Sequence, residues 1–273
     1  IESFKIVLPL EPTRLATSDL QYVVLQKMRL KDPLKSQLEL IDIALRSLMD
    51  GIHATTQPIL YAIQVQKFIN EAKRIAETSK SHQLRVHFAE LNLDWRRRRA
   101  LLEPLDMMAK VLLTEAIVGH ISMTPEFDEP SIKEINTLIK TVQEATKSEK
   151  EVRRLFFVQS NLGAYLSKRK KTQLAVKAYQ SALVIAKTFA STHPDSLVTA
   201  LSNLGFLTKR AEKPKRAKAL FDEAFTRAQQ LIEKQPDAHS LWLKTYYRAL
   251  SFGTLAAQRS LTLIASTHEK KLS

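Results

Sequence analysis

The densest charge in the chain is a run of four arginines: Arg96, Arg97, Arg98 and Arg99. Four successive residues of a helix point to all sides of its axis, so some of these side chains must meet carboxylates, a partner or phosphate. One interpretation is contact with RNA or an acidic protein, with Trp95 beside them for stacking on a base. The other is a structural network with Asp94, Glu103 and carboxylates elsewhere. The sequence leaves both open.

Two more basic clusters fall at predicted turns between helices. The first consists of Lys168, Arg169, Lys170 and Lys171, and the second of Lys209, Arg210, Lys213, Lys215 and Arg216. Solvated polar residues are common at such turns, so neither cluster alone indicates a function. Because the two turns are one helix pair apart, we expect them to lie side by side. Together they predict a basic edge that would dock a phosphate backbone or an acidic strip.

Residue patterns typical of catalysis or metal binding do not occur. The seven histidines include no i, i+4 pair, the five glycines form no phosphate-binding loop, and no serine lies in a nucleophile motif. The absence of cysteine excludes disulfides, thiolate zinc sites and cysteine nucleophiles. We therefore predict that the protein is not an enzyme and has no catalytic residues, metal or cofactor.

Charge and hydropathy indicate the kind of partner. The net charge of +14 favours anionic partners, and nucleic acid, acidic protein and anionic lipid all qualify. No apolar run is long enough for a transmembrane helix, and the first residues resemble neither a secretory signal nor an Arg-rich targeting helix. A start at Ile1 fits either a truncated chain or a matured organellar protein. We expect an intracellular protein, cytoplasmic or in the mitochondrial matrix.

The elements that must position these residues follow from an internal repeat. The segment 160–163, Ser-Asn-Leu-Gly, recurs 42 residues later at 202–205. At fixed spacings past each glycine come an alanine, an aromatic residue and another alanine: Ala175, Tyr179 and Ala182 in the first copy, Ala217, Phe221 and Ala224 in the second. We expect each copy to be a pair of antiparallel helices. Its small residues would let the helices approach, and its aromatic residue would fill the space between neighbouring pairs.

At these residues the chain resembles the tetratricopeptide repeat family. The 42-residue period, with His193-Pro194-Asp195 leading into the second copy, is similar to the kinesin-light-chain type. The resemblance covers roughly residues 156–235 and departs from the usual pattern at Thr208 and Gln159. It implies an all-α fold, a right-handed superhelix of antiparallel helix pairs (an α-solenoid), with the first helix of each pair lining a groove for an extended or helical peptide.

The resemblance also implies which side chains face this groove. In the first copy they are Phe157, Ser160, Ala164, Ser167 and Lys168, and in the second copy Thr199, Ser202, Phe206, Lys209 and Arg210. Asn161 and Asn203 match an asparagine that family members often use to hold a peptide backbone. The alternative role for these asparagines is hydrogen bonding between adjacent repeats.

Part of the same region also resembles 14-3-3 proteins, which bind phosphorylated peptides. The resemblance is carried by 178–180, 192–194 and 221–224. That family's phosphate grip includes an Arg-Tyr pair on the helix that corresponds to 156–167, where this chain has Ala164-Tyr165. A phosphopeptide site is therefore a minor alternative.

Prolines and hydrophobic periodicity divide the rest of the chain. We expect an extended segment at 1–16, divergent helical repeats at 17–121 (with helices over 56–78, 82–102 and 103–121), a loop at 122–130, a helix with Ser131 as its N-cap, repeats through 235, and a C-terminal capping helix and tail at 236–273. The aromatic face of that last helix would cover the end of the stack or bind a partner.

These observations predict a non-enzymatic interaction scaffold, an adaptor or structural subunit of a larger assembly. It would bind proteins, with acidic peptides among the candidates, through its groove and basic edges. The alternative is a basic subunit of a ribonucleoprotein or mitochondrial complex that contacts RNA. The oligomeric state has no signature in the sequence.

Overall fold

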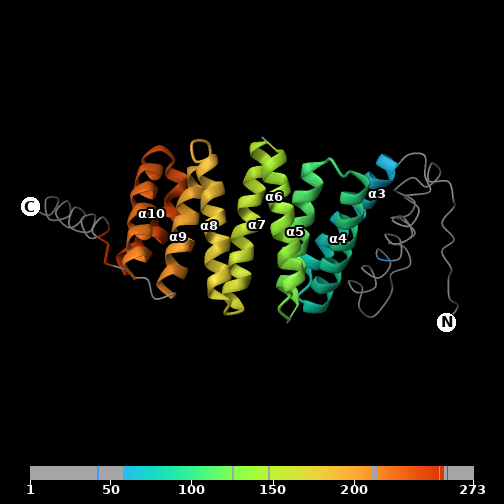
Figure 1. The fold of residues 1–273 in the computed structure, drawn as a ribbon, viewed down its shortest axis with the longest axis horizontal. Helices are drawn as coiled ribbons and strands as arrows, with labels where there is room; N and C mark the ends of the chain where they lie inside the picture. Colours follow the sequence, from blue (N-terminus) through green and yellow to red (C-terminus); the bar gives the residue numbers. More distant parts are fainter. Residues whose placement is uncertain are drawn as a thin grey trace, which may run out of the picture. The chain divides into compact units, whose positions relative to one another are not determined.

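The computed structural model describes residues 42, 58–124, 126–146, 148–210, 214–251, 253, 254 and 257, and all regular elements in these ranges are helices (Figure 1). In chain order they are α3 (Pro58–Thr78), α4 (His82–Leu102), α5 (Met107–Met123), α6 (Glu129–Ala145), α7 (Glu149–Lys168), α8 (Thr172–Thr188), α9 (Pro194–Arg210), α10 (Pro214–Lys234), the 3-10 helix η2 (Pro236–Ala238) and α11 (His239–Ser251). The predicted all-α fold class is confirmed. No helix in the described ranges has the length and apolar character needed to cross a membrane. The predicted segment 1–16, the part of the predicted divergent repeats at 17–57 apart from residue 42, the prediction for Lys213 and most of the C-terminal tail lie outside these ranges.

Two compact units divide the chain, Ile1–Leu138 and Ile139–Ser273, and each is described by itself. In the first unit α3 packs on α4, and α4 packs on α5. The helices predicted at 56–78 and 82–102 match α3 and α4. The third begins at Met107 rather than at 103, because Asp106 caps it by accepting a hydrogen bond from Met108 N at 2.8 Å.

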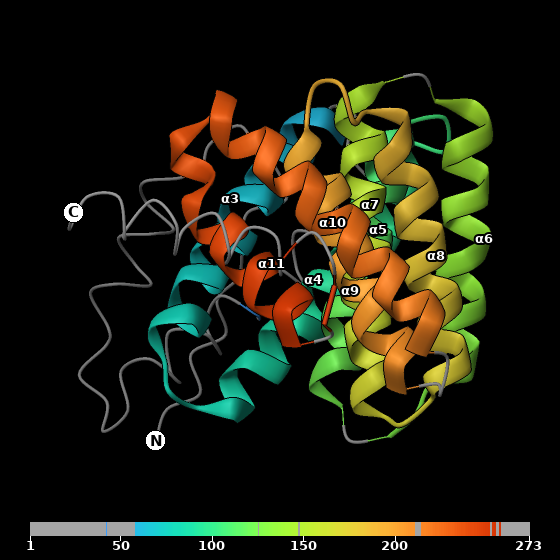
Figure 2. The same cartoon turned by 90° about the vertical axis from the view of Figure 1, so that its left-hand side faces the viewer.

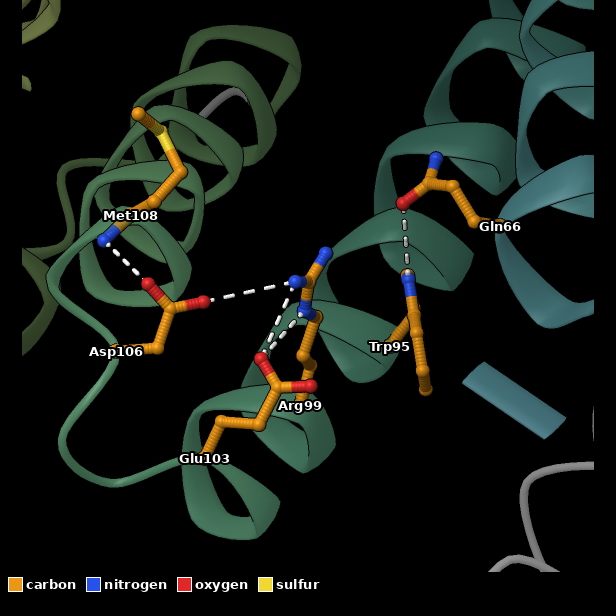
Figure 3. Close-up of polar contacts among 6 residues, drawn as sticks. All are labelled: Gln66, Trp95, Arg99, Glu103, Asp106 and Met108. Atoms are coloured by element: carbon orange, nitrogen blue, oxygen red, sulfur yellow. Dashed lines mark hydrogen bonds and ion pairs between the residues drawn. The ribbon is translucent and has the colours of Figure 1, made fainter. Parts of the chain in front are cut away.

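Trp95 belongs to the core of the first unit. Its side chain has no exposed surface, and its indole Nε1 donates to Gln66 Oε1 on α3 at 3.4 Å (Figure 3). A ring without exposed surface cannot stack on a base, so the interpretation of Trp95 as a stacking platform was wrong. The residue instead anchors α4 against α3.

The start of α6 differs from the prediction. Asp128, rather than Ser131, is the capping residue: its Oδ1 accepts from Ser131 N at 2.9 Å and its Oδ2 accepts from Ser131 Oγ at 2.7 Å. These bonds to the charged form lower the pKa of the Asp128 carboxyl. As a result α6 begins at Glu129, inside the segment 122–130 that was predicted as a loop, and α5 ends at Met123.

The second unit contains helices that pack in chain order. α7 packs on α8, α8 on α9, α9 on α10 and α10 on α11, and α11 also contacts α9 (Figure 2). This consecutive packing is that of an α-solenoid, as predicted. The predicted C-terminal helix, α11, packs on α10 through its aromatic residues. The rings of Trp242 and Tyr246 stack with their centroids 5.4 Å apart, and the ring centroid of Tyr246 lies 5.5 Å from that of Phe225 on α10. Tyr247 remains exposed.

The repeated glycine and aromatic residues meet within one pair of helices. A β-carbon at Gly163 on α7 would lie 2.9 Å from ring atoms of Tyr179 on α8, and one at Gly205 on α9 would lie 3.2 Å from ring atoms of Phe221 on α10. The aromatic residue therefore fills the space opposite the glycine of its own pair. Phe221 also belongs to a buried cluster with Tyr246 and Ala249 of α11, the first helix of the next pair, so it packs between neighbouring pairs as predicted.

A methyl group added at each glycine tests this contact. Gly163→Ala should lower the free energy of unfolding by about 1–2 kcal/mol, because overpacking outweighs the gain in helix propensity. Gly205→Ala should cost less than about 1 kcal/mol, since Phe221 needs to move only slightly. Gly119→Ala is the control. Its methyl group would meet nothing within 4 Å, so this substitution should raise the free energy of unfolding by up to about 1 kcal/mol. Urea unfolding followed by circular dichroism measures all three.

The double variant Gly163→Ala/Tyr179→Ala isolates the ring. Without the ring, the alanine at 163 should stabilise the protein as the one at 119 does. An unchanged cost of Gly163→Ala when the ring is absent would contradict this account of the repeat.

Candidate binding face on the first helices

Hydrogen bonds join the first helices of successive pairs at about the spacing of the repeat. Arg210 Nη1 on α9 donates to Ser167 Oγ on α7 at 3.3 Å, and Arg248 Nη1 on α11 donates to Ser202 Oγ on α9 at 2.7 Å. The three first helices therefore lie side by side. We call the surface that they form here the first-helix face, defined by Ser160, Asn161, Ala164, Ser167, Ser202, Asn203, Phe206 and Arg248.

The predicted groove residues lie on α7 and α9 but are unequally accessible. Phe157 and Phe206 are 45% and 47% exposed, large fractions for aromatic side chains. Lys168, Lys209 and Arg210 are exposed, Ser160 is partly buried and Ser202 is buried. Binding of a peptide by these residues stays a prediction.

The two asparagines of the repeat behave differently. Asn203 Oδ1 accepts a long hydrogen bond from Arg248 Nη1 at 3.5 Å, which is the bond between adjacent first helices that was the alternative for these residues. Asn161 is exposed and makes no side-chain hydrogen bond with the described part of the chain. Asn161 is therefore the asparagine whose amide is available to a peptide backbone.

Arg248 is the residue of this face that the sequence analysis missed. It lies 42 residues after Phe206, which itself lies 42 residues after Ala164. The 42-residue spacing therefore predicts that Arg248 lies on the same face. The spacing was not applied to this segment because 236–273 was interpreted as a capping helix and tail rather than as a further repeat.

Arg248 is partly buried among uncharged groups. Its guanidinium lies 6.0 Å from the centroid of the Phe206 ring, close enough for a cation–π contact. Burial lowers the pKa of Arg248, and the Tyr179 hydroxyl partly opposes this; burial likewise raises the pKa of Tyr179, and the arginine opposes it. Within the described residues Arg248 makes no ion pair with a carboxylate. The face thus holds a positive charge that is partly removed from water and has no carboxylate partner in the part of the chain that the structure describes.

Ser160 is the register equivalent of Ser202, but its Oγ is buried without a hydrogen-bond partner in the described residues. The reason is the same register. The residue that follows Ser202 by 46 positions is Arg248, whereas the residue that follows Ser160 by 46 positions is Phe206, which cannot donate. A polar group of a ligand would satisfy this hydroxyl.

The arginine run on α4 forms the structural network that was one of its two interpretations. Arg96 is buried. Arg97 pairs with Glu134 at 3.1 Å, and Arg98 pairs with Asp94 at 3.4 Å. Arg99 contacts Glu103 at 3.1 Å and Asp106 at 3.5 Å, which ties the end of α4 to the cap of α5 (Figure 3). A contact of this run with RNA stays untested.

The first basic turn has an unusual backbone. Lys170 has φ 59°, in the left-handed region that favours glycine, and the turn closes with Lys171 N donating to Leu166 O at 2.9 Å. Next to Lys170 in the sequence, the Arg169 guanidinium lies 5.4 Å from the centroid of the Tyr165 ring. A lysine thus occupies a position at the end of α7 that glycine would fill with less strain.

No group of three or more histidine, aspartate or glutamate residues able to hold a metal ion occurs in the described ranges. The side chains described above are suited to binding: exposed aromatic rings, an amide, and, as far as the described residues go, a hydroxyl without a hydrogen-bond partner and a guanidinium without a carboxylate partner.

These features define an all-α helical-repeat protein with its candidate binding residues on the first helices. Residues 197–238 match a family model described as "Tetratricopeptide repeat". The predicted resemblance to the tetratricopeptide repeat family is thus confirmed for the segment formed by most of α9, α10 and η2. A crystal structure of BtubC (BKLC) from P. vanneervenii is similar, with a TM-score of 0.44 and 20% identity over 64% of this chain and 71% of that chain. No curated protein matches the chain.

The strain at Lys170 can be measured. Lys170→Gly should raise the free energy of unfolding by up to about 1 kcal/mol, because glycine adopts this backbone conformation without a β-carbon clash. Lys170→Ala is the matched control, since it removes the same charge but keeps the β-carbon. In urea unfolding, a Lys170→Gly protein no more stable than Lys170→Ala would show that the turn is not strained.

Proposed function

We propose that this chain is a non-enzymatic protein-interaction scaffold that holds an extended, acidic peptide on the first-helix face. The repeat fold supports an interaction scaffold in general. The observation that carries the finer proposal is Arg248, a partly buried guanidinium bonded to Ser202 and Asn203, with no carboxylate partner among the described residues.

The chemistry of the peptide follows from its surroundings. A carboxylate would supply the missing counter-charge and form charge-assisted hydrogen bonds with the guanidinium, which Ser202 already orients. Asn161 is available to hold a peptide backbone, and Ser160 Oγ can accept or donate one bond. Phe157 and Phe206 offer apolar contact area beside these polar groups.

The alternative, a subunit that contacts RNA through the α4 run, has less support. At least three of its four arginines are already engaged with carboxylates of the same unit: Arg97, Arg98 and Arg99. RNA would have to displace these ion pairs, which reduces the gain from phosphate contact.

The test is a selection of random peptides displayed on phage against the whole chain, followed by affinities of a synthetic peptide chosen from it. We expect enrichment of aspartate and glutamate. Arg248→Met should weaken the chosen peptide at least about tenfold, because charge-assisted hydrogen bonds contribute about 1.5–3 kcal/mol. Arg248→Lys should bind with intermediate affinity, since lysine keeps the charge but loses the planar fork.

Arg227→Met is the matched control, because Arg227 lies on α10, outside the first-helix face, in an exposed pair with Glu223. The urea midpoint of Arg248→Met should stay near that of the unmodified chain, which excludes unfolding as the cause. Equal peptide affinities for Arg248→Met and Arg227→Met, or selected peptides without acidic residues, would refute the proposal.

A further inference from the structure

The second unit has a strongly basic edge that the proposed function does not use. All four residues at 168–171 are basic, as are six of the ten residues at 209–218, and Glu212 is the only acidic residue in the two segments. Ten basic residues and one acidic residue give these 14 positions a net charge of +9, out of +14 for the whole chain. Most of the excess charge of the protein is therefore concentrated at two turns.

A direct contact fixes these turns beside each other. Arg210 at the end of α9 donates to Ser167 at the end of α7, one residue before the first cluster. We call the surface of both turns the basic edge, defined by its described residues Lys168, Arg169, Lys170, Lys171, Lys209, Arg210, Lys215 and Arg216.

The basic edge differs from the arginine run of α4 in its partners. The α4 arginines face Asp94, Glu103, Asp106 and Glu134, whereas Lys168, Lys170, Lys215 and Arg216 make no ion pair with the described part of the chain. These four side chains, together with Lys171, Lys209 and Arg210, are exposed. The basic edge is thus a surface where several cations remain available to an external anion.

The ends of the helices strengthen the positive field. The edge contains the N-termini of α8 and α10, whose partial positive charge usually attracts acidic residues. Neither helix has an acidic residue in its first turn to neutralise this charge; α3, α4, α5 and α11 share this property, whereas α6, α7 and α9 have Glu129, Glu149 and Asp195 in their first turns. Lys170 adds a strained backbone where glycine would suffice. The basic residues here work against local stability, which favours a role in binding.

The surroundings indicate which anion fits. None of the described residues within 168–171 and 209–218 is an exposed large apolar residue; exposed ones lie three residues outside these segments, Leu174 on α8 and Phe206 on α9. A protein partner usually needs buried apolar anchors at the centre of its interface, and a membrane-binding surface inserts apolar side chains. A phosphodiester backbone needs neither, because lysines, arginines and helix N-termini contact its phosphates.

We propose that the basic edge docks the phosphate backbone of a nucleic-acid strand without reading its bases. This site adjoins the first-helix face where Arg210 donates to Ser167 but shares no residue with it, and the two sites would allow the chain to hold a peptide and a nucleic acid together. The partner is recognised by the spacing and charge of its phosphates.

The test uses the whole chain and fluorescent oligo(U) and oligo(dT) of about twenty nucleotides, with binding measured by anisotropy at several salt concentrations. We expect the two oligonucleotides to bind within about threefold of each other, since neither the base nor the 2′-hydroxyl is read. Replacing Lys168, Lys170, Lys215 and Arg216 with glutamine should weaken binding at least about tenfold at 0.1 M salt. It should also reduce the slope of log affinity against log salt by about 2–3.

A matched control removes four exposed lysines elsewhere: Lys67, Lys133, Lys140 and Lys234, each replaced with glutamine. It has the same net charge as the edge variant and should bind nearly as well as the unmodified chain. Equal losses of oligonucleotide affinity in the two variants would show that only net charge matters and would overturn the proposal. The proposal would also be overturned if polyglutamate of equal charge displaced the oligonucleotide at the same concentration. A third contradicting result is binding to anionic vesicles without binding to either oligonucleotide.

Arg248→Met separates the two proposals. It should leave oligonucleotide affinity unchanged, because Arg248 is not part of the basic edge. If Arg248→Met and the edge variant weaken oligonucleotide binding equally, the nucleic acid occupies the first-helix face and the basic edge is not the site.

Discussion

An aromatic ring lying on a glycine is the contact on which the second unit depends. Tyr179 lies on Gly163 and Phe221 lies on Gly205, and each contact leaves no room for a β-carbon without movement. The distance between two packed helix axes depends on the side chains between them. A glycine on one helix therefore allows the two helices to approach more closely. The contact recurs after 42 residues, so the two pairs share one geometry and can stack in chain order.

The stacking of equal pairs brings residues from neighbouring register positions of the first helices together. Ser202 meets Arg248 and Ser167 meets Arg210, so a substitution at one register position acts on the next helix. The same stacking places successive turns beside each other, which concentrates basic residues that are 42 positions apart in the sequence. The chain compensates its arginines within α4 but leaves Arg248 and part of the basic edge without carboxylates among the described residues. Charge without an internal partner is what distinguishes the two candidate sites from structural ion pairs.

Sequence periodicity predicted the helices well, because apolar spacing and proline positions are local properties. It also predicted both basic turns and the glycine register. It failed where the answer depends on which helix lies opposite. Nothing in the sequence shows that Trp95 is buried against α3, that Tyr179 packs on its own pair, or that Glu134 reaches Arg97 from 37 residues away. Arg248 was predictable from the 42-residue register, but its lack of a carboxylate partner among the described residues becomes visible only when the neighbouring helices are in place.

The side-by-side register of the first helices is the central claim, and a cross-link tests it directly. The chain contains no cysteine, so an introduced pair reports one distance. With a bismaleimide that spans about 8 Å, the pair Ser167→Cys/Arg210→Cys should cross-link efficiently. The pair Ser167→Cys/Thr199→Cys should not, because Thr199 lies about 16 Å further along α9 at 1.5 Å per residue. Equal cross-linking of both pairs, or preference for the second, would contradict the register and with it the first-helix face.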